Sequence, residues 1–241
     1  MDFGGKKHSL RGGRHFLRVV VPAGFAALGL ALTACGSAGS SPSAAAAGPK
    51  LDPSAYVLTS GSAATNGYKA EPNSDTTEST AFQDPVPKCM HLSSGGLGPA
   101  STAHANGDMF SDDDGTAIES GARVFASADT VTRHVDLVHR ADFPDCLAQA
   151  VMGELSKSGG MSGATVRSAT AQPPPRGATA LTRIIFNVSA SGDTVEVNVD
   201  LISIFRGRVE SVILVVNPLT QVSTDTLTAL SGQVVGKLAN Q

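Results

Sequence analysis

The chain has 241 residues, a formal net charge of −3, three cysteines and no tryptophan. This length suits one folded domain with additional flanking segments. The acidic balance argues against nucleic acid as a partner, because nucleic-acid-binding domains present basic surfaces.

The N-terminal segment has the layout of a secretory signal. Residues 1–18 carry five basic side chains and one acidic one, and residues 19–32 carry no charge. A basic stretch followed by a short apolar stretch is typical of such signals. Fourteen helical residues reach roughly 21 Å, which is short of a hydrocarbon core of about 30 Å, so we do not expect a transmembrane helix.

A cysteine follows the apolar stretch at once. Leu32, Thr33 and Ala34 precede Cys35, and Gly36 follows it. This pattern resembles the bacterial lipobox, which implies that a diacylglycerol is attached to the Cys35 thiol and that the chain is cleaved before Cys35. The protein would then be located on the extracytoplasmic face of the cell membrane. Acyl chains would then anchor the protein to the membrane. The alternative is a plain secreted protein with an incidental cysteine.

Three segments follow from this interpretation. Residues 1–34 are expected to be the lipoprotein signal peptide, residues 35–50 a flexible tether rich in Gly, Ser and Ala, and residues 51–241 a single extracytoplasmic domain. Since residues 1–34 carry a net charge of +4, their removal changes the net charge from −3 to −7.

Two cysteines remain if Cys35 carries lipid. Export favours a disulfide between Cys89 and Cys146, because only one intramolecular pairing is possible. The alternative is a reactive thiol at Cys146, near the start of a predicted helix, where the helix dipole lowers a thiol pKa.

Few regular elements are expected before residue 117. Pro85 and Pro87 leave room for at most one short helical turn, around Ser79–Asp84. An irregular strand is expected over Ser101–Phe110. The run Asp112–Asp114 suggests a solvated turn or a calcium loop, although three consecutive acids do not converge on one point.

Periodic patterns govern the rest of the chain. Helical spacing predicts helices over Ala128–His139, after Asp142 with Pro144 in the first turn, and from Thr224 to the C-terminus. Period-two patterns of apolar and polar residues, together with the turn residues between them, predict five strands. They cover Ala117–Phe125, Ala164–Ala169, Leu181–Ala190, Val195–Phe205 and Val209–Asn217. Apolar residues alternate with polar ones at the start of the strand predicted over Val195–Phe205, but the alternation changes phase at Ile202–Phe205. This change indicates either a bulge or burial on both faces. The predicted fold is α+β, an antiparallel sheet of about five or six strands with two or three packed helices.

Several of these segments resemble actinobacterial lipoproteins related to the PknH-type extracellular sensor domain and to LpqN-type lipoproteins. The resemblance lies in residues 142–147, in Phe186–Ser189 with Val197–Leu201, in Arg206–Val209 and in the closing amphipathic helix. It implies an α+β domain with an antiparallel sheet and a cleft that binds ligands or partners.

The leading functional expectation is a ligand-binding or sensor-like domain without catalysis or a cofactor. Its partner would be a small molecule, a lipid or an envelope protein. Asp200 and Arg208 flank a predicted hairpin and are candidates to line a cleft, or they belong to a surface strand face. The alternative is an envelope-assembly lipoprotein.

A hydrolytic enzyme is less expected. No G-x-S-x-G elbow occurs, and the histidines show no metal-ligand spacing. His134 and His139 lie five residues apart on one predicted helix and do not share a face. We expect His91, His104, His134 and His139 to be solvent-exposed, and we expect no metal site.

Overall fold

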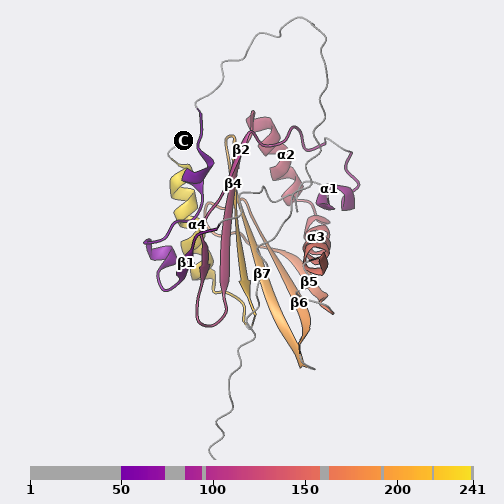
Figure 1. Cartoon of the computed structure of the whole chain (residues 1–241). Helices are drawn as coiled ribbons and strands as arrows, with labels where there is room; N and C mark the ends of the chain where they lie inside the picture. Colours follow the sequence, from indigo (N-terminus) through magenta and orange to yellow (C-terminus); the bar gives the residue numbers. More distant parts are fainter. Residues whose placement is uncertain are drawn as a thin grey trace, which may run out of the picture.

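The computed structural model describes residues 50–73, 85–93, 96–157, 163–190, 193–218 and 220–239. Within these ranges one antiparallel sheet of eight strands carries four α-helices, with two short 3-10 helices near the start (Figure 1). The strands are β1 (Lys69–Glu71), β2 (Ala103–Asn106), β3 (Met109–Ser111), β4 (Ala117–Val124), β5 (Thr165–Gln172), β6 (Ala180–Ala190), β7 (Asp193–Arg206) and β8 (Val209–Asn217). The helices are η1 (Pro53–Tyr56), η2 (Ala63–Thr65), α1 (Pro85–Cys89), α2 (Ala128–Val138), α3 (Phe143–Lys157) and α4 (Thr224–Leu238).

The sheet is built around a meander. Its strand order is β1-β3-β4-β8-β7-β6-β5, and β2 pairs with β4 beside this path. Strands β5 to β8 pair in sequence order, each antiparallel to the next. The predicted antiparallel arrangement of these strands is therefore confirmed. Gly207 turns β7 into β8 with a φ of +56°, a left-handed conformation that favours glycine.

The fold class agrees with the α+β prediction, but the sequence underestimated the number of elements. It predicted five or six strands and two or three helices, whereas the described residues form eight and four. The expected strand over Ser101–Phe110 is divided into β2 and β3 at Gly107, which is buried. A Cβ at Gly107 would lie 2.5 Å from the Ser120 Oγ, so the chain turns there against β4.

The prediction that prolines exclude a helix at residues 85–87 was wrong. Helix α1 contains both Pro85 and Pro87 in its first turn. The first backbone N–H groups of a helix have no acceptor within the helix, so proline loses no hydrogen bond there. The helical turn expected around Ser79–Asp84 lies outside the described residues.

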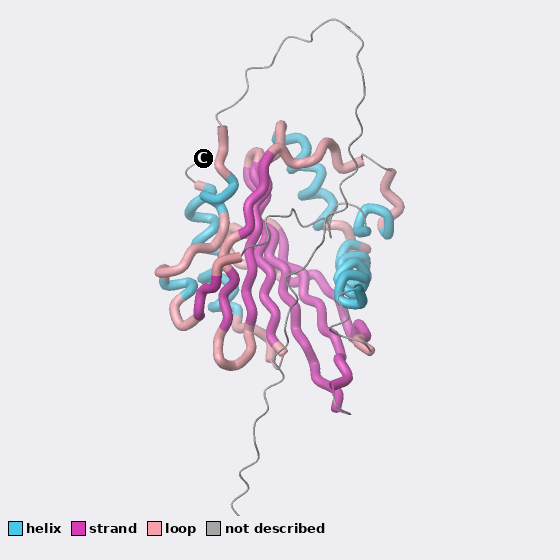
Figure 2. The backbone as a smooth tube through the Cα atoms, in the orientation of Figure 1, coloured by secondary structure: helices cyan, strands magenta, loops and turns pink. Residues whose placement is uncertain are grey.

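Helices cover both faces of the sheet (Figure 2). Helix α4 packs on one face, where its predicted apolar stripe is buried; that stripe is Leu227, Leu230, Val234 and Leu238. Helices α1, α2 and α3 pack on the other face and form a second apolar cluster. The C-terminal part of α4 also holds the N-terminal segment, because the Lys237 Nζ donates to the Val57 carbonyl at 2.6 Å.

The parity shift in β7 reflects burial on both faces. Val199 and Leu201 belong to the cluster under α1, α2 and α3, whereas Ile202 and Ile204 belong to the cluster under α4. Pairing with β6 and β8 continues through this stretch without a register shift. The irregularity lies instead in the edge strand β5, between Val166 and Ser168.

Cys89 at the end of α1 is disulfide-bonded to Cys146 in α3, the pair expected from the sequence. All described elements, both apolar clusters and this bond lie within residues 50–239. In that part of the chain, no helix combines the length and hydropathy needed to cross a bilayer. The predicted signal peptide, Cys35 and the tether up to residue 49 lie outside the described residues.

Candidate functional site

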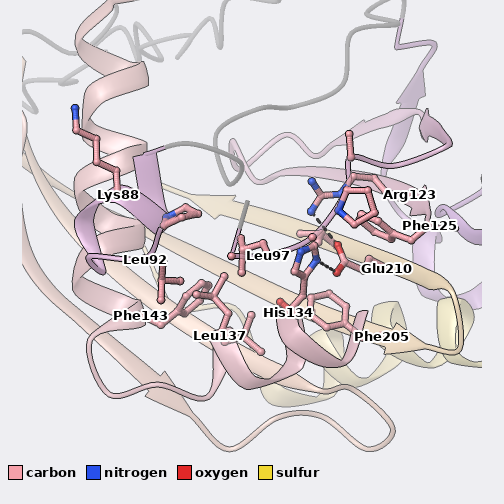
Figure 3. Close-up of a pocket in the computed structure, with 18 of the residues that line it drawn as sticks. Lys88, Leu92, Leu97, Arg123, Phe125, His134, Leu137, Phe143, Phe205 and Glu210 are labelled. Atoms are coloured by element: carbon pink, nitrogen blue, oxygen red, sulfur yellow. Dashed lines mark hydrogen bonds and ion pairs between the residues drawn. The ribbon is translucent and has the colours of Figure 1, made fainter. Parts of the chain in front are cut away.

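A cavity of about 590 Å³ lies between the sheet, helix α2 and the segment that follows α1 (Figure 3). Most of its wall is apolar. The apolar lining residues are Pro87, Leu92, Leu97, Pro99, Ala100, Phe125, Leu137, Val138, Phe143, Leu201, Phe205 and Val212. A hollow of this size and lining matches the usual dimensions of small-molecule sites.

One buried carboxylate gives the cavity its polar end. Glu210 on β8 accepts a hydrogen bond from the Arg123 Nη2 at 2.9 Å, through its Oε2. Its other oxygen, Oε1, is hydrogen-bonded to the His134 Nδ1. The Glu210 side chain is only 1% exposed, against 16% for Arg123 and 12% for His134. Both oxygens of the carboxylate therefore have partners, as a buried charge requires.

The local fold explains how these three side chains meet. Arg123 and Glu210 are direct register partners on β4 and β8, so they point to the same face of the sheet. His134 reaches that face from α2, which starts after Ser127 and packs on β7 and β8. The Phe125 ring meets the His134 ring edge-on, with centroids 5.2 Å apart, and supports its orientation.

Residues 96–100 close one side of the cavity, and Gly98 packs tightly on α2. Gly98 adopts a φ of +91°, and a Cβ there would lie 2.6 Å from the Arg133 Nη2 and 3.1 Å from the Thr130 Oγ1. Only glycine fits both the backbone conformation and the close approach. The wall formed by Leu97 and Pro99 depends on this contact.

The sequence did not identify the residues that form this site. His134 was expected to be exposed, and that expectation was wrong: its ring is held between Glu210 and Phe125. His91, His104 and His139 are exposed, as expected. His139 lies just beyond the end of α2, where its Nδ1 contacts the Val135 carbonyl.

The two residues suggested for a cleft do not line this cavity. Asp200 is buried on the opposite face of the sheet, where Arg183 pairs with it at 2.7 Å. Arg208 is outside the lining, although its carbonyl accepts the Phe125 N–H. The structure therefore separates both residues from the cavity.

The acidic run forms a turn. The Asp112 carboxylate accepts the N–H groups of Asp114 and Thr116, and Asp113 pairs with Lys69 at 2.6 Å. No group of three or more His, Cys, Asp and Glu side chains among the described residues is arranged to hold a metal ion.

No protein-family model matches the chain, and no curated protein matches it. Several solved structures show weak similarity. The extracellular domain of PknH from Mycobacterium tuberculosis is 12% identical with a TM-score of 0.34, over 66% of this chain and 70% of that one. The Ran-binding protein Mog1p of Saccharomyces cerevisiae is 13% identical with a TM-score of 0.27, over 55% of this chain and 76% of that one.

Proposed function

We propose that this chain is an extracytoplasmic lipoprotein whose folded domain binds a small, largely apolar ligand without catalysing a reaction. The observation that carries the proposal is the cavity beside Glu210, with its apolar wall and its single buried polar cluster. Binding sites commonly combine an extended apolar lining with a few polar groups that orient the ligand.

The cavity has room for such a ligand. Its volume of about 590 Å³ falls within the roughly 300–1,000 Å³ that is usual for ligand pockets. Leu137 and Phe143 line it from the helical side and Phe205 lines it from the sheet, so an apolar body would have apolar contacts on both sides (Figure 3). Displacing water from these surfaces would supply the main driving force.

Membrane anchoring through Cys35 is the second part of the proposal. The lipobox-like residues before Cys35 support it, and so does the disulfide, because such bonds persist outside the cytosol. We expect Cys35→Ala to lose incorporation of radiolabelled palmitate and to move the mature-size protein out of the membrane fraction. Retention of the label and of the mature form in that fraction would contradict the proposal.

Ligand binding can be tested by native mass spectrometry of the exported chain without its lipid-bearing Cys35, that is, residues 36–241. This chain contains every described element, both apolar clusters and the disulfide. We expect a small molecule bound to the wild-type chain and absent from Val212→Trp. Val212 lines the cavity, and the indole ring of tryptophan would fill part of it. The matched control is Val166→Trp on β5, where the native side chain is 40% exposed and remote from the lining. Equal occupancy of both variants would contradict the proposal.

A protein partner is the second candidate function. Val212, Leu214 and Val216 form a half-buried apolar row on β8 that continues from the cavity along the same face. A partner would cover this row. Leu214→Glu would then reduce the amount of any envelope protein cross-linked to the chain, while leaving small-molecule binding intact.

A further inference from the structure

We propose that the ligand of the cavity is an amphipathic anion, with an apolar body and a carboxylate or phosphate head group beside Arg123 and His134. This inference rests on the proposed function, because it names the chemical class of the ligand for the same cavity. It is carried by the charges that line the cavity and by their positions.

The charged groups that reach the cavity surface are positive. The formally charged lining residues are Lys88, Arg123 and Glu210. Glu210 is the only acid among them, and it is the least exposed of the three. Both of its oxygens already accept hydrogen bonds, from Arg123 and from His134. A ligand would therefore meet the Lys88 and Arg123 side chains rather than the carboxylate.

The buried polar cluster lies at one end of the cavity. Figure 3 shows Arg123, His134 and Glu210 together there, with Phe125 and Phe205 beside them, and Leu92 and Phe143 at the other end, on the side of Lys88. An elongated ligand can place its head group at the first end and its apolar body at the second. Such a molecule is amphipathic by necessity.

The sign of the head group follows from the same geometry. A cationic head would find no acceptor there, because both Glu210 oxygens already have partners and the carboxylate is only 1% exposed. An anionic head would form a charge-assisted hydrogen bond in a partly desolvated site, which is stronger than a neutral one. The selection is local, since the chain as a whole is acidic and repels anions at long range.

Four ligands with one alkyl chain length test the proposal by titration calorimetry on the exported chain. They are decanoate, decyl phosphate, decanol and decyltrimethylammonium, each below its micellar concentration. We expect the two anions to bind about 10- to 100-fold more tightly than decanol, and the cation to bind most weakly. Comparing the two anions distinguishes a carboxylate-preferring site from a phosphate-preferring one.

Two failures are distinguishable. If decanol or the cation binds as tightly as the anions, and Val212→Trp abolishes that binding, the anionic class is overturned while the proposed function stands. If none of the four ligands binds, both proposals fail.

Matched variants locate the head group. The double variant Arg123→Gln/Glu210→Gln removes opposite charges together, so no unpaired charge is buried. We expect it to lose the preference for anions, leaving decanoate and decanol within about 3-fold of each other. Arg176→Gln, an exposed position outside the lining, should retain the full preference. Lys88→Gln should also retain it, and a loss there would overturn the assignment of the head group to Arg123. Should the double variant not fold, the wild-type ligand series still decides the question.

Discussion

Arg183 on β6 and Asp200 on β7 form a bidentate ion pair on the sheet face that α4 covers. The Arg183 Nε lies 2.7 Å from the Asp200 Oδ1, and the Nη2 lies 2.9 Å from the Oδ2. The Nη1 also donates to the Gln221 Oε1 at 2.8 Å, just before α4 begins. The pair therefore connects the middle of the meander to the start of the last helix.

The two single substitutions that break this ion pair should destabilise the fold by different amounts. Arg183→Leu leaves the Asp200 carboxylate, which is 1% exposed, buried without its cation, and we expect a loss of about 3 kcal/mol in the free energy of unfolding. Asp200→Leu should cost less, because the Arg183 side chain is more exposed and can reach water. The double variant should be more stable than Arg183→Leu. Urea unfolding of the three variants measures this cycle, and equal losses for both single variants would contradict it.

Opening the disulfide should destabilise the domain and loosen one wall of the cavity. Cys89 and Cys146 are 57 residues apart, and closing such a loop is worth about 4 kcal/mol in the chain-entropy model. Lys88 and Leu92, which line the cavity, lie within three residues of Cys89 in the sequence. We expect the Cys89→Ala/Cys146→Ala variant to unfold at lower urea and to bind decanoate more weakly. A variant with unchanged unfolding would show that the bond does not constrain the domain.

The long elements of this fold could be predicted because their patterns are local. Strand β8 was predicted at Val209–Asn217, the bounds that the structure gives, because the Arg206–Gly207 turn precedes it and Pro218 ends it. Strands β1 and β3 have only three residues each, too few for alternation to be visible. Their pairing with each other and with β4 depends on tertiary contacts instead.

The candidate site could not be predicted for a related reason. Arg123 and Glu210 are 87 residues apart, and they become neighbours only because β4 pairs with β8. Glu210 was the one available signal, since a lone acid within an otherwise apolar strand needs a partner. The sequence does not specify which cation supplies it. His134 lies on an amphipathic helix, and periodicity alone does not distinguish a histidine that faces water from one that faces a cavity.

The Arg140–Asp142 pair predicts a dependence of stability on pH. Hydrogen bonding from Arg140 is the main cause that lowers the pKa of the Asp142 carboxyl, and both side chains are exposed at the start of α3. An acid whose pKa is lower in the folded state stabilises the fold above its unfolded pKa of about 3.9. This contribution is lost as the pH falls through the lower folded value.

Thermal unfolding of wild type and Asp142→Asn should therefore differ most near neutral pH. We expect the difference in Tm to shrink steadily below about pH 4 and to vanish in stronger acid. Arg140→Gln removes the same pair from the other side and should give the same profile. A difference that stays constant down to the acid limit would contradict the assignment.

Asn198 should be a site where a substitution stabilises the protein. It lies in the middle of β7, with Ile185 on β6 and Asn217 on β8 as its register partners. Its side chain is buried, and neither the Oδ1 nor the Nδ2 has a hydrogen-bond partner among the described residues. Burying an amide without partners costs about 1–3 kcal/mol in protein mutational data.

Leucine is close to asparagine in shape and has no polar atoms. Asn198→Leu leaves the backbone ladder of β7 unchanged, and we expect the free energy of unfolding to rise by about 1 kcal/mol or more. In a domain of this size, that increase corresponds to roughly 2–4 °C in Tm. Asn187→Leu on β6, where the side chain is only half-buried, is the matched control and should change stability by less than about 0.5 kcal/mol. A loss of stability in Asn198→Leu alone would show that the native amide is hydrogen-bonded in solution.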